Sequence, residues 1–151
     1  MLTVPILLSA CTVFLDQLIK MIVQVEMSPG MSIPVIQDVF HITFVLNPGA
    51  AFGILAHQRL FFIVMGIAIL LLGGVLYPYI CRQCLLFRYG AALLLGGAFG
   101  NLIDRIRFGH VIDFFDFRVW PVFNIADIAI VIGVCSIIYA ILFKMHHVEN
   151  S

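Results

Sequence analysis

Residues 123–143 read FNIADIAIVIGVCSIIYAILF, and this stretch decides the class of fold. It carries no charged residue after Asp127, and its length matches the roughly 20 mostly apolar residues that a bilayer-spanning helix needs. Two polar side chains, Asn124 and Asp127, stand near its start. The stretch therefore predicts a membrane helix that begins with an amide and a carboxylate.

The composition of the whole chain agrees with a membrane environment. Of the 151 residues, 63% are hydrophobic and 11% are charged, against about 45–50% and about 25% in soluble domains. So many apolar residues exclude a disordered chain, and a soluble domain of this size could not bury them. Eight Lys and Arg balance eight Asp and Glu without a basic cluster, so we expect no nucleic-acid partner.

Three further apolar stretches lie upstream, at about residues 4–25, 60–80 and 85–103. With 123–143 they predict an all-α membrane protein of four transmembrane helices with a small β element, in one domain over residues 1–151. The sequence Leu8-Ser9-Ala10-Cys11 looks like a lipoprotein cleavage sequence. However, no Lys or Arg precedes the first stretch, and its apolar run continues past Cys11. We therefore expect a retained helix.

The charges flanking these stretches do not settle the orientation. An even number of spans places both termini on one side of the membrane. Arg82, Arg88 and Lys144 would make that side cytoplasmic by the positive-inside rule. The opposite side carries four arginines of its own: Arg59, Arg105, Arg107 and Arg118.

Two loops carry structure of their own. In the first loop, about residues 26–59, apolar and polar residues alternate over 39–46, which predicts a strand. Residues 31–36 and 51–55 could pair with it, giving a short β-sheet on the membrane surface. The third loop, about residues 104–121, combines charges with aromatic side chains, as is typical of a segment at the membrane–water interface.

Small and sulfur-containing residues point to packing rather than chemistry. Ala92, Gly96 and Gly100 share one helix face, where a second helix can approach closely. Cys81 and Cys84 form one CxxC pair without the second half of a zinc site. The sequence therefore predicts no metal site.

The polar residues of the apolar stretches gather at one end of the predicted bundle. A carboxylate inside a bilayer costs roughly 2.5–3.5 kcal/mol on insertion scales, so such residues are candidates for function. Asp16 with Lys20, and Asp104 with Arg105, could be structural ion pairs. The cluster comprises Asp16, Lys20, Asn47, Asn101, Asp104, Arg105, Asp113, Asn124 and Asp127.

Asp113 and Asp127 differ from Asp16 and Asp104 because neither has a Lys or Arg at helical spacing. Two carboxylates close together at low dielectric cannot both ionise easily, so one keeps a proton while the other is charged. This state suits general acid–base attack of water on an amide. The residues alone favour an aspartic protease, with a proton- or cation-coupled transporter or channel subunit close behind. A non-catalytic membrane scaffold is a third reading.

Five motifs, in order along nearly the whole chain, resemble those of the lipoprotein signal peptidase (signal peptidase II) family. They are Asp16-Gln17 with Lys20, NPGAAFG at 47–53, GGAFGNLIDR at 96–105, GHVIDF at 109–114 and FNIAD at 123–127.

The resemblance implies an intramembrane aspartic endopeptidase with Asp113 and Asp127 as the catalytic pair. It implies removal of the signal peptide from diacylglyceryl-modified prolipoproteins, with cleavage before the lipidated cysteine and without a cofactor. Residues expected to line or support the site are Asp16, Lys20, Asn47, Gly49, Asn101, Asp104, Arg105, Asn124 and Ala126.

The resemblance also implies a location and partners. The chain is expected in the bacterial cytoplasmic (inner) membrane, with both termini cytoplasmic and the site near the periplasmic face. Membrane lipids and prolipoproteins are the expected partners, the antibiotic globomycin is the expected inhibitor, and a monomer is the expected state.

Overall fold

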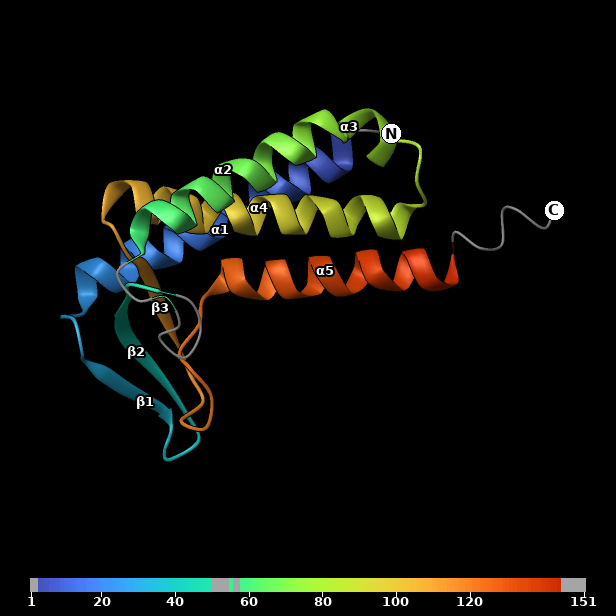
Figure 1. Ribbon diagram of the computed structural model, residues 1–151. Helices are drawn as coiled ribbons and strands as arrows, with labels where there is room; N and C mark the ends of the chain where they lie inside the picture. The colour runs from blue at the N-terminus through green and yellow to red at the C-terminus, as the bar shows by residue number, and fades with distance from the viewer. Residues whose placement is uncertain (1–2, 50–54, 56–57, 145–151) are drawn as a thin grey trace.

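The computed structural model describes residues 3–49, 55 and 58–144. Four helices form a bundle, with a small sheet at one end (Figure 1): α1 (Thr3–Glu26), α2 (Arg59–Val75), α4 (Leu85–Arg107) and α5 (Ile125–Phe143). Within the described residues, α1, α4 and α5 are long and apolar enough to cross a membrane, and α2 is a shorter apolar helix of 17 residues. The start of α1 and the end of α5 lie at the end of the bundle away from the sheet.

The predicted span 60–80 is helical along nearly its whole length, but it consists of two helices rather than one. α2 ends at Val75, and residues Tyr77–Ile80 form a separate short helix, α3. Pro78 lies in the first turn of α3. Because proline has no backbone N–H and clashes with the preceding turn, a continuous helix through this position is unfavourable. The two helices are therefore separated at Leu76, two residues before the proline.

The other helix bounds differ from the predicted ones by a few residues. α4 continues to Arg107 rather than ending at residue 103, with Arg105 and Arg107 in its last turn, where positive charge complements the helix dipole. α5 begins at Ile125 rather than at 123, because Asn124 and Asp127 form a capping box. The amide that opens the apolar stretch is thus the cap of the helix.

α4 is the centre of the bundle, with α1, α2 and α5 packed around it. Glycines on α4 permit the close contacts. A Cβ at Gly96 would lie 2.9 Å from the carbonyl oxygen of Ser9 on α1, and a Cβ at Gly97 would collide with the carbonyl oxygen of Ala126 on α5. The predicted close-packing face is therefore one of two, because α4 presents small residues to two neighbours.

The sheet is antiparallel with the order β1–β2–β3, formed by β1 (Ser32–Ile36), β2 (Phe40–Asn47) and β3 (Val111–Asp116). The strand predicted at 39–46 and its partner at 31–36 are confirmed. The other candidate partner, residues 51–55, lies outside the described residues except for Leu55, which is in a turn. The third loop, predicted as a surface segment, instead supplies β3 on the far edge of β2.

Alternation along β3 gives its two faces different surroundings. Ile112 and Phe114 are buried in a core cluster with Val23 of α1 and with Met27, which directly follows α1. Asp113 points the opposite way, and it is aligned with Val45 of β2. The core cluster therefore fixes β3 against the end of α1 and holds Asp113 over the bundle.

Candidate active site

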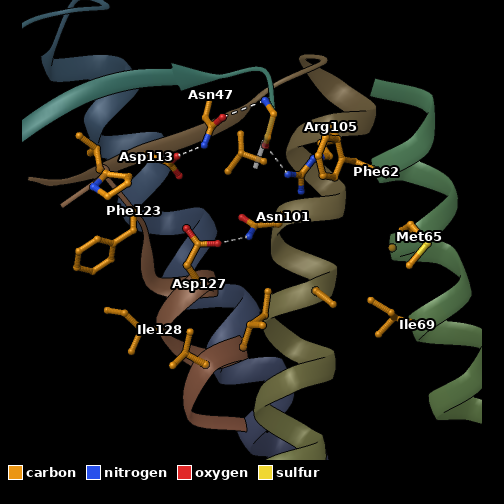
Figure 2. Close-up of a pocket in the computed structure, with 18 of the residues that line it drawn as sticks. Asn47, Phe62, Met65, Ile69, Asn101, Arg105, Asp113, Phe123, Asp127 and Ile128 are labelled. Atoms are coloured by element: carbon orange, nitrogen blue, oxygen red, sulfur yellow. Dashed lines mark hydrogen bonds between the residues drawn. The ribbon is translucent and has the colours of Figure 1, made fainter. Parts of the chain in front are cut away.

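A cavity of about 660 Å³ lies where the sheet meets the helices. Its polar end holds side chains from β2, α4, β3 and α5, and its apolar wall follows α2 and α5 (Figure 2). The lining residues include Asn47, Gly49, Phe62, Met65, Ile69, Asn101, Arg105, Asp113, Trp120, Phe123, Asp127, Ile128 and Val131.

Asp113 is held by two amide side chains. Its Oδ2 accepts from Asn47 Nδ2 at 2.8 Å, and its Oδ1 accepts from Asn124 Nδ2 at 2.6 Å. The side chain of Asp113 is 1% exposed. Burial, followed by the nearby charge of Asp127, raises the pKa of Asp113 to about 7, although the two amide donors act in the opposite direction.

Asp127 lies in the first turn of α5 and is held by an amide and a backbone group. Its Oδ1 accepts from Asn101 Nδ2 at 2.7 Å, and its Oδ2 accepts from the backbone N–H of Asn124 at 3.2 Å. The N-terminus of a helix favours negative charge, because the peptide dipoles and unpaired N–H groups point toward it. The site of Asp127 therefore suits a carboxylate.

Asn124 connects the two aspartates. Its Oδ1 accepts from the backbone N–H of Asp127 at 2.9 Å, which completes the helix cap, while its Nδ2 donates to Asp113. Asn124 is fully buried. The residue that starts α5 thus also fixes the position of Asp113 relative to Asp127.

A separate ion cluster lies behind these residues. Lys20 Nζ is 2.8 Å from Asp16 Oδ2 and 2.8 Å from Asp104 Oδ2, and all three side chains are at most 1% exposed. Asp16 Oδ1 also accepts from the backbone N–H of Ala126, and Asp104 Oδ2 from that of Ile112. The cluster therefore ties α1 and α4 to the start of α5 and to β3.

The predicted pair of Asp104 with Arg105 is wrong, whereas the pair of Asp16 with Lys20 is confirmed. Successive residues on a helix point about 100° apart, so Asp104 faces α1 while Arg105 faces the cavity. Arg105 Nη2 donates to the carbonyl oxygen of Gly49 at 3.2 Å, and its guanidinium lies over the ring of Phe62, 4.6 Å from the centroid.

All the residues singled out in the sequence come together at this end of the bundle, in two layers. Residues 50–53 of the first-loop motif lie outside the described residues. The layer that lines the cavity is Asn47, Gly49, Asn101, Arg105, Asp113 and Asp127. The layer behind it is Asp16, Lys20, Asp104, Asn124 and Ala126.

Three further residues support the site and were not predicted from the sequence. Gln17 Nε2 donates to Asp104 Oδ1 at 2.9 Å, and Phe62 lies beneath Arg105. Arg59 donates to the last carbonyl groups of α4, at 3.0 Å to Arg105 and 2.9 Å to Ile106. Gln17 is a polar residue inside the apolar stretch 4–25, and Arg59 directly precedes the stretch 60–80. A polar side chain in such a position is the sequence feature from which both could have been predicted.

The donor types of the site suit acid–base chemistry. In the part of the chain that the structure describes, no group of three His, Cys, Asp or Glu side chains could hold a metal ion.

Asp116, on the sheet, forms an ion pair with Arg118 at 3.2 Å and accepts from Thr43 at 2.7 Å. Burial by itself raises the pKa of Asp116, but the hydrogen bonds from Thr43 and Arg118 and the charge of Arg118 together outweigh burial. The pKa of Asp116 therefore lies below its ordinary value.

Comparisons with known proteins identify the family of this chain. A family model described as "Signal peptidase (SPase) II" matches residues 8–143. A protein of Moorella thermoacetica named "Lipoprotein signal peptidase" is 47% identical over 139 residues, covering 91% of this chain and 93% of its own. One with the same name from Halothermothrix orenii is 48% identical over 126 residues, covering 83% of this chain and 86% of its own.

A solved structure gives the same result at the level of the fold. It is described as a bacterial membrane enzyme determined by the in meso method at 2.3 Å resolution. It has a TM-score of 0.84 and 37% sequence identity, and the match covers 91% of this chain and 87% of the other. The chain therefore belongs to the signal peptidase II family of aspartic proteases.

Proposed function

We propose that this protein removes signal peptides from diacylglyceryl-modified prolipoproteins by cutting before the lipidated cysteine, with Asp113 and Asp127 as the catalytic pair. The relatives named above carry the name lipoprotein signal peptidase. The observation that carries the assignment of residues is the cavity itself. Its polar end holds two aspartates that share contacts with Asn124, and the rest of its wall is apolar.

The two carboxylates differ in a way that suits hydrolysis. The raised pKa of Asp113, about 7, lets this residue carry a proton near neutral pH, and the N-terminus of α5 favours a carboxylate at Asp127. Asp127 takes a proton from water as the water oxygen bonds to the scissile carbonyl carbon, and Asp113 gives its proton to the carbonyl oxygen. Asp127 then protonates the leaving nitrogen, the C–N bond breaks, and one hydroxyl group of the intermediate returns its proton to Asp113.

The apolar wall of the cavity supports a lipidated substrate. Met65 and Ile69 of α2 and Ile128 and Val131 of α5 extend the cavity along the helices from the polar end (Figure 2). Acyl chains bound there would bury apolar surface, which favours association. We expect globomycin to occupy the same cavity.

The arrangement of the chain supports a placement in the bacterial inner membrane. α1, α4 and α5 are the candidate membrane helices, and we propose that α2 with α3 completes a fourth crossing. The start of α1 and the end of α5 lie away from the sheet (Figure 1), so both would be cytoplasmic and the cavity would lie near the periplasmic face. The protein would act as a monomer.

The test is cleavage of a purified diacylglyceryl-modified prolipoprotein by the protein in liposomes. The wild type is expected to release the signal peptide, and Asp113→Asn and Asp127→Asn are each expected to lower the rate by about 10³-fold or more. Asp38→Asn is the matched control, because Asp38 is an exposed acid outside the cavity. Failure of the wild type to cleave would overturn the function, and retained activity in either site variant would overturn the pair.

A further inference from the structure

Lys20 is fully occupied as a hydrogen-bond donor. Its ammonium group lies 2.8 Å from Asp16 Oδ2, 2.8 Å from Asp104 Oδ2 and 3.0 Å from Asn101 Oδ1. An ammonium group has three N–H donors and no acceptor. Each hydrogen of Lys20 thus has one partner, and the partner on Asn101 has to be the amide oxygen.

This contact fixes the orientation of the Asn101 amide. With its oxygen on Lys20, Asn101 presents Nδ2 to Asp127 Oδ1 at 2.7 Å. The reversed amide would place its NH2 group against the ammonium and its oxygen against a carboxylate oxygen, and both contacts are repulsive. Asn124 Nδ2, at 3.2 Å from Asn101 Oδ1, favours the same orientation.

We infer that Lys20 is a positioning residue for the reaction: acting through Asn101, it keeps Asp127 as the ionised general base. The inference rests on the proposed function. Within the described residues, Lys20 forms no hydrogen bond or ion pair with Asp113 or Asp127, and it does not line the cavity. The hydrogen-bonded route from Lys20 to Asp127 therefore passes through the amide of Asn101.

Other charged groups also face Asp127 and must be separated from this effect. Asp113 faces it from β3 and Arg105 from α4, while Lys20 of α1 and Asp104 of α4 lie beyond Asn101. A change of charge at Lys20 would act on Asp127 through space even without the amide. The variant that removes Lys20 therefore keeps the net charge of the cluster constant, and the amide of Asn101 is a second variable.

The first comparison measures kcat/KM against pH for the full-length protein in liposomes, with the lipidated prolipoprotein as substrate. Lys20→Met combined with Asp104→Asn preserves the net charge of the cluster, and Asp104→Asn alone retains Lys20. The acid limb of the profile reports ionisation of the general base. It is expected to move to higher pH by about one unit in the double variant, because loss of a hydrogen-bond donor disfavours the charged form of a carboxylate. In Asp104→Asn it is not expected to move to higher pH, because Lys20 still holds Asn101 and the net charge of the cluster is one unit more positive.

The second comparison tests the route through the amide. Asn101→Leu removes the donor and is expected to shift the acid limb in the same direction. Adding Lys20→Met and Asp104→Asn to Asn101→Leu is then expected to produce no further shift. Asn101→Leu also keeps the test decisive if the Lys20 double variant does not fold, because an unshifted limb in Asn101→Leu contradicts the inference by itself.

The outcomes are distinct from those of the proposed function. If the wild type does not cleave, the function fails and the inference with it. If the wild type cleaves and the Lys20 double variant has the profile of Asp104→Asn, the function stands and Lys20 is only structural. If the Lys20 shift persists in the Asn101→Leu background, Lys20 acts through space, and the role of the amide is overturned.

Discussion

Two sets of carboxylates lie at the sheet end of the bundle, and different kinds of groups hold them. Asp16 and Asp104 share the ammonium of Lys20 at 2.8 Å each. Asp113 and Asp127 accept only from amide and backbone N–H groups, and within the described residues neither forms an ion pair. In the first set, one ammonium balances one of the two carboxylate charges. In the second set, only the dipoles of neutral N–H groups stabilise the carboxylates.

The difference shows how a carboxylate can be kept reactive inside an apolar protein. A cation beside a buried carboxylate favours the charged form of that carboxylate and so lowers its affinity for a proton. Neutral donors orient a carboxylate without lowering its proton affinity as strongly as a cation would. The cluster of Asp16, Lys20 and Asp104 therefore supports the structure of the site, whereas Asp113 and Asp127 remain able to exchange protons with a substrate.

The largest effect on stability is expected on the side of the ion cluster. Lys20→Met leaves Asp16 and Asp104 buried without their cation and is expected to lower the free energy of unfolding by about 3–5 kcal/mol. Denaturation in detergent, followed by circular dichroism, measures the loss. Adding Asp104→Asn should restore part of it, and a Lys20→Met variant as stable as the wild type would show that the cluster is not a support.

Substitution of Asp113 is expected to raise stability relative to the wild type, rather than lower it, as the pH increases. Because the pKa of Asp113 is raised to about 7 in the folded protein, Asp113 contributes stability at low pH that is lost as the pH rises through about 7. Asp113→Asn removes this loss, so its stability relative to the wild type is expected to increase by about 2–3 kcal/mol from pH 5 to pH 8.

Asp116→Asn is the control for that pH series. The pKa of Asp116 lies below its ordinary value, so this carboxylate is charged from pH 5 to pH 8 in both the folded and the unfolded state. Its stability difference from the wild type is therefore expected to be constant over the range. A constant difference for Asp113→Asn as well would contradict the raised pKa of Asp113.

A smaller loss of stability is expected from a change at the first turn of α5, which both sets of carboxylates contact. A Cβ at Gly97 would collide with the carbonyl oxygen of Ala126 and move the first turn of α5 away from α4. Gly97→Ala is expected to cost about 1–3 kcal/mol of stability and to reduce cleavage, because the contacts of both Asp16 and Asp127 pass through that turn.

Gly74→Ala is the matched control for Gly97→Ala. A Cβ at Gly74 has open space around it on α2, so this change is expected to raise stability by up to about 1 kcal/mol through helix propensity. Equal effects of the two substitutions on cleavage would show that the contact of α4 with α5 does not position the site.

The sequence alone determined the features that depend on local pattern. Apolar stretches of membrane length predicted the helices, and alternation at 39–46 predicted a strand. The absence of a Lys or Arg at helical spacing distinguished Asp113 and Asp127 from Asp16 and Asp104. These features are local because helix length, strand alternation and the spacing of charges involve residues close together in the chain.

Only the tertiary structure decided which distant groups meet. It paired Lys20 with Asp104 rather than leaving Asp104 to Arg105, made β3 the third strand of the sheet, and oriented Asn101 toward Asp127. The contact between Lys20 and Asn101 spans 81 positions of sequence. No local pattern encodes such a contact, because it exists only when close packing of α1 and α5 on α4 brings their polar ends together.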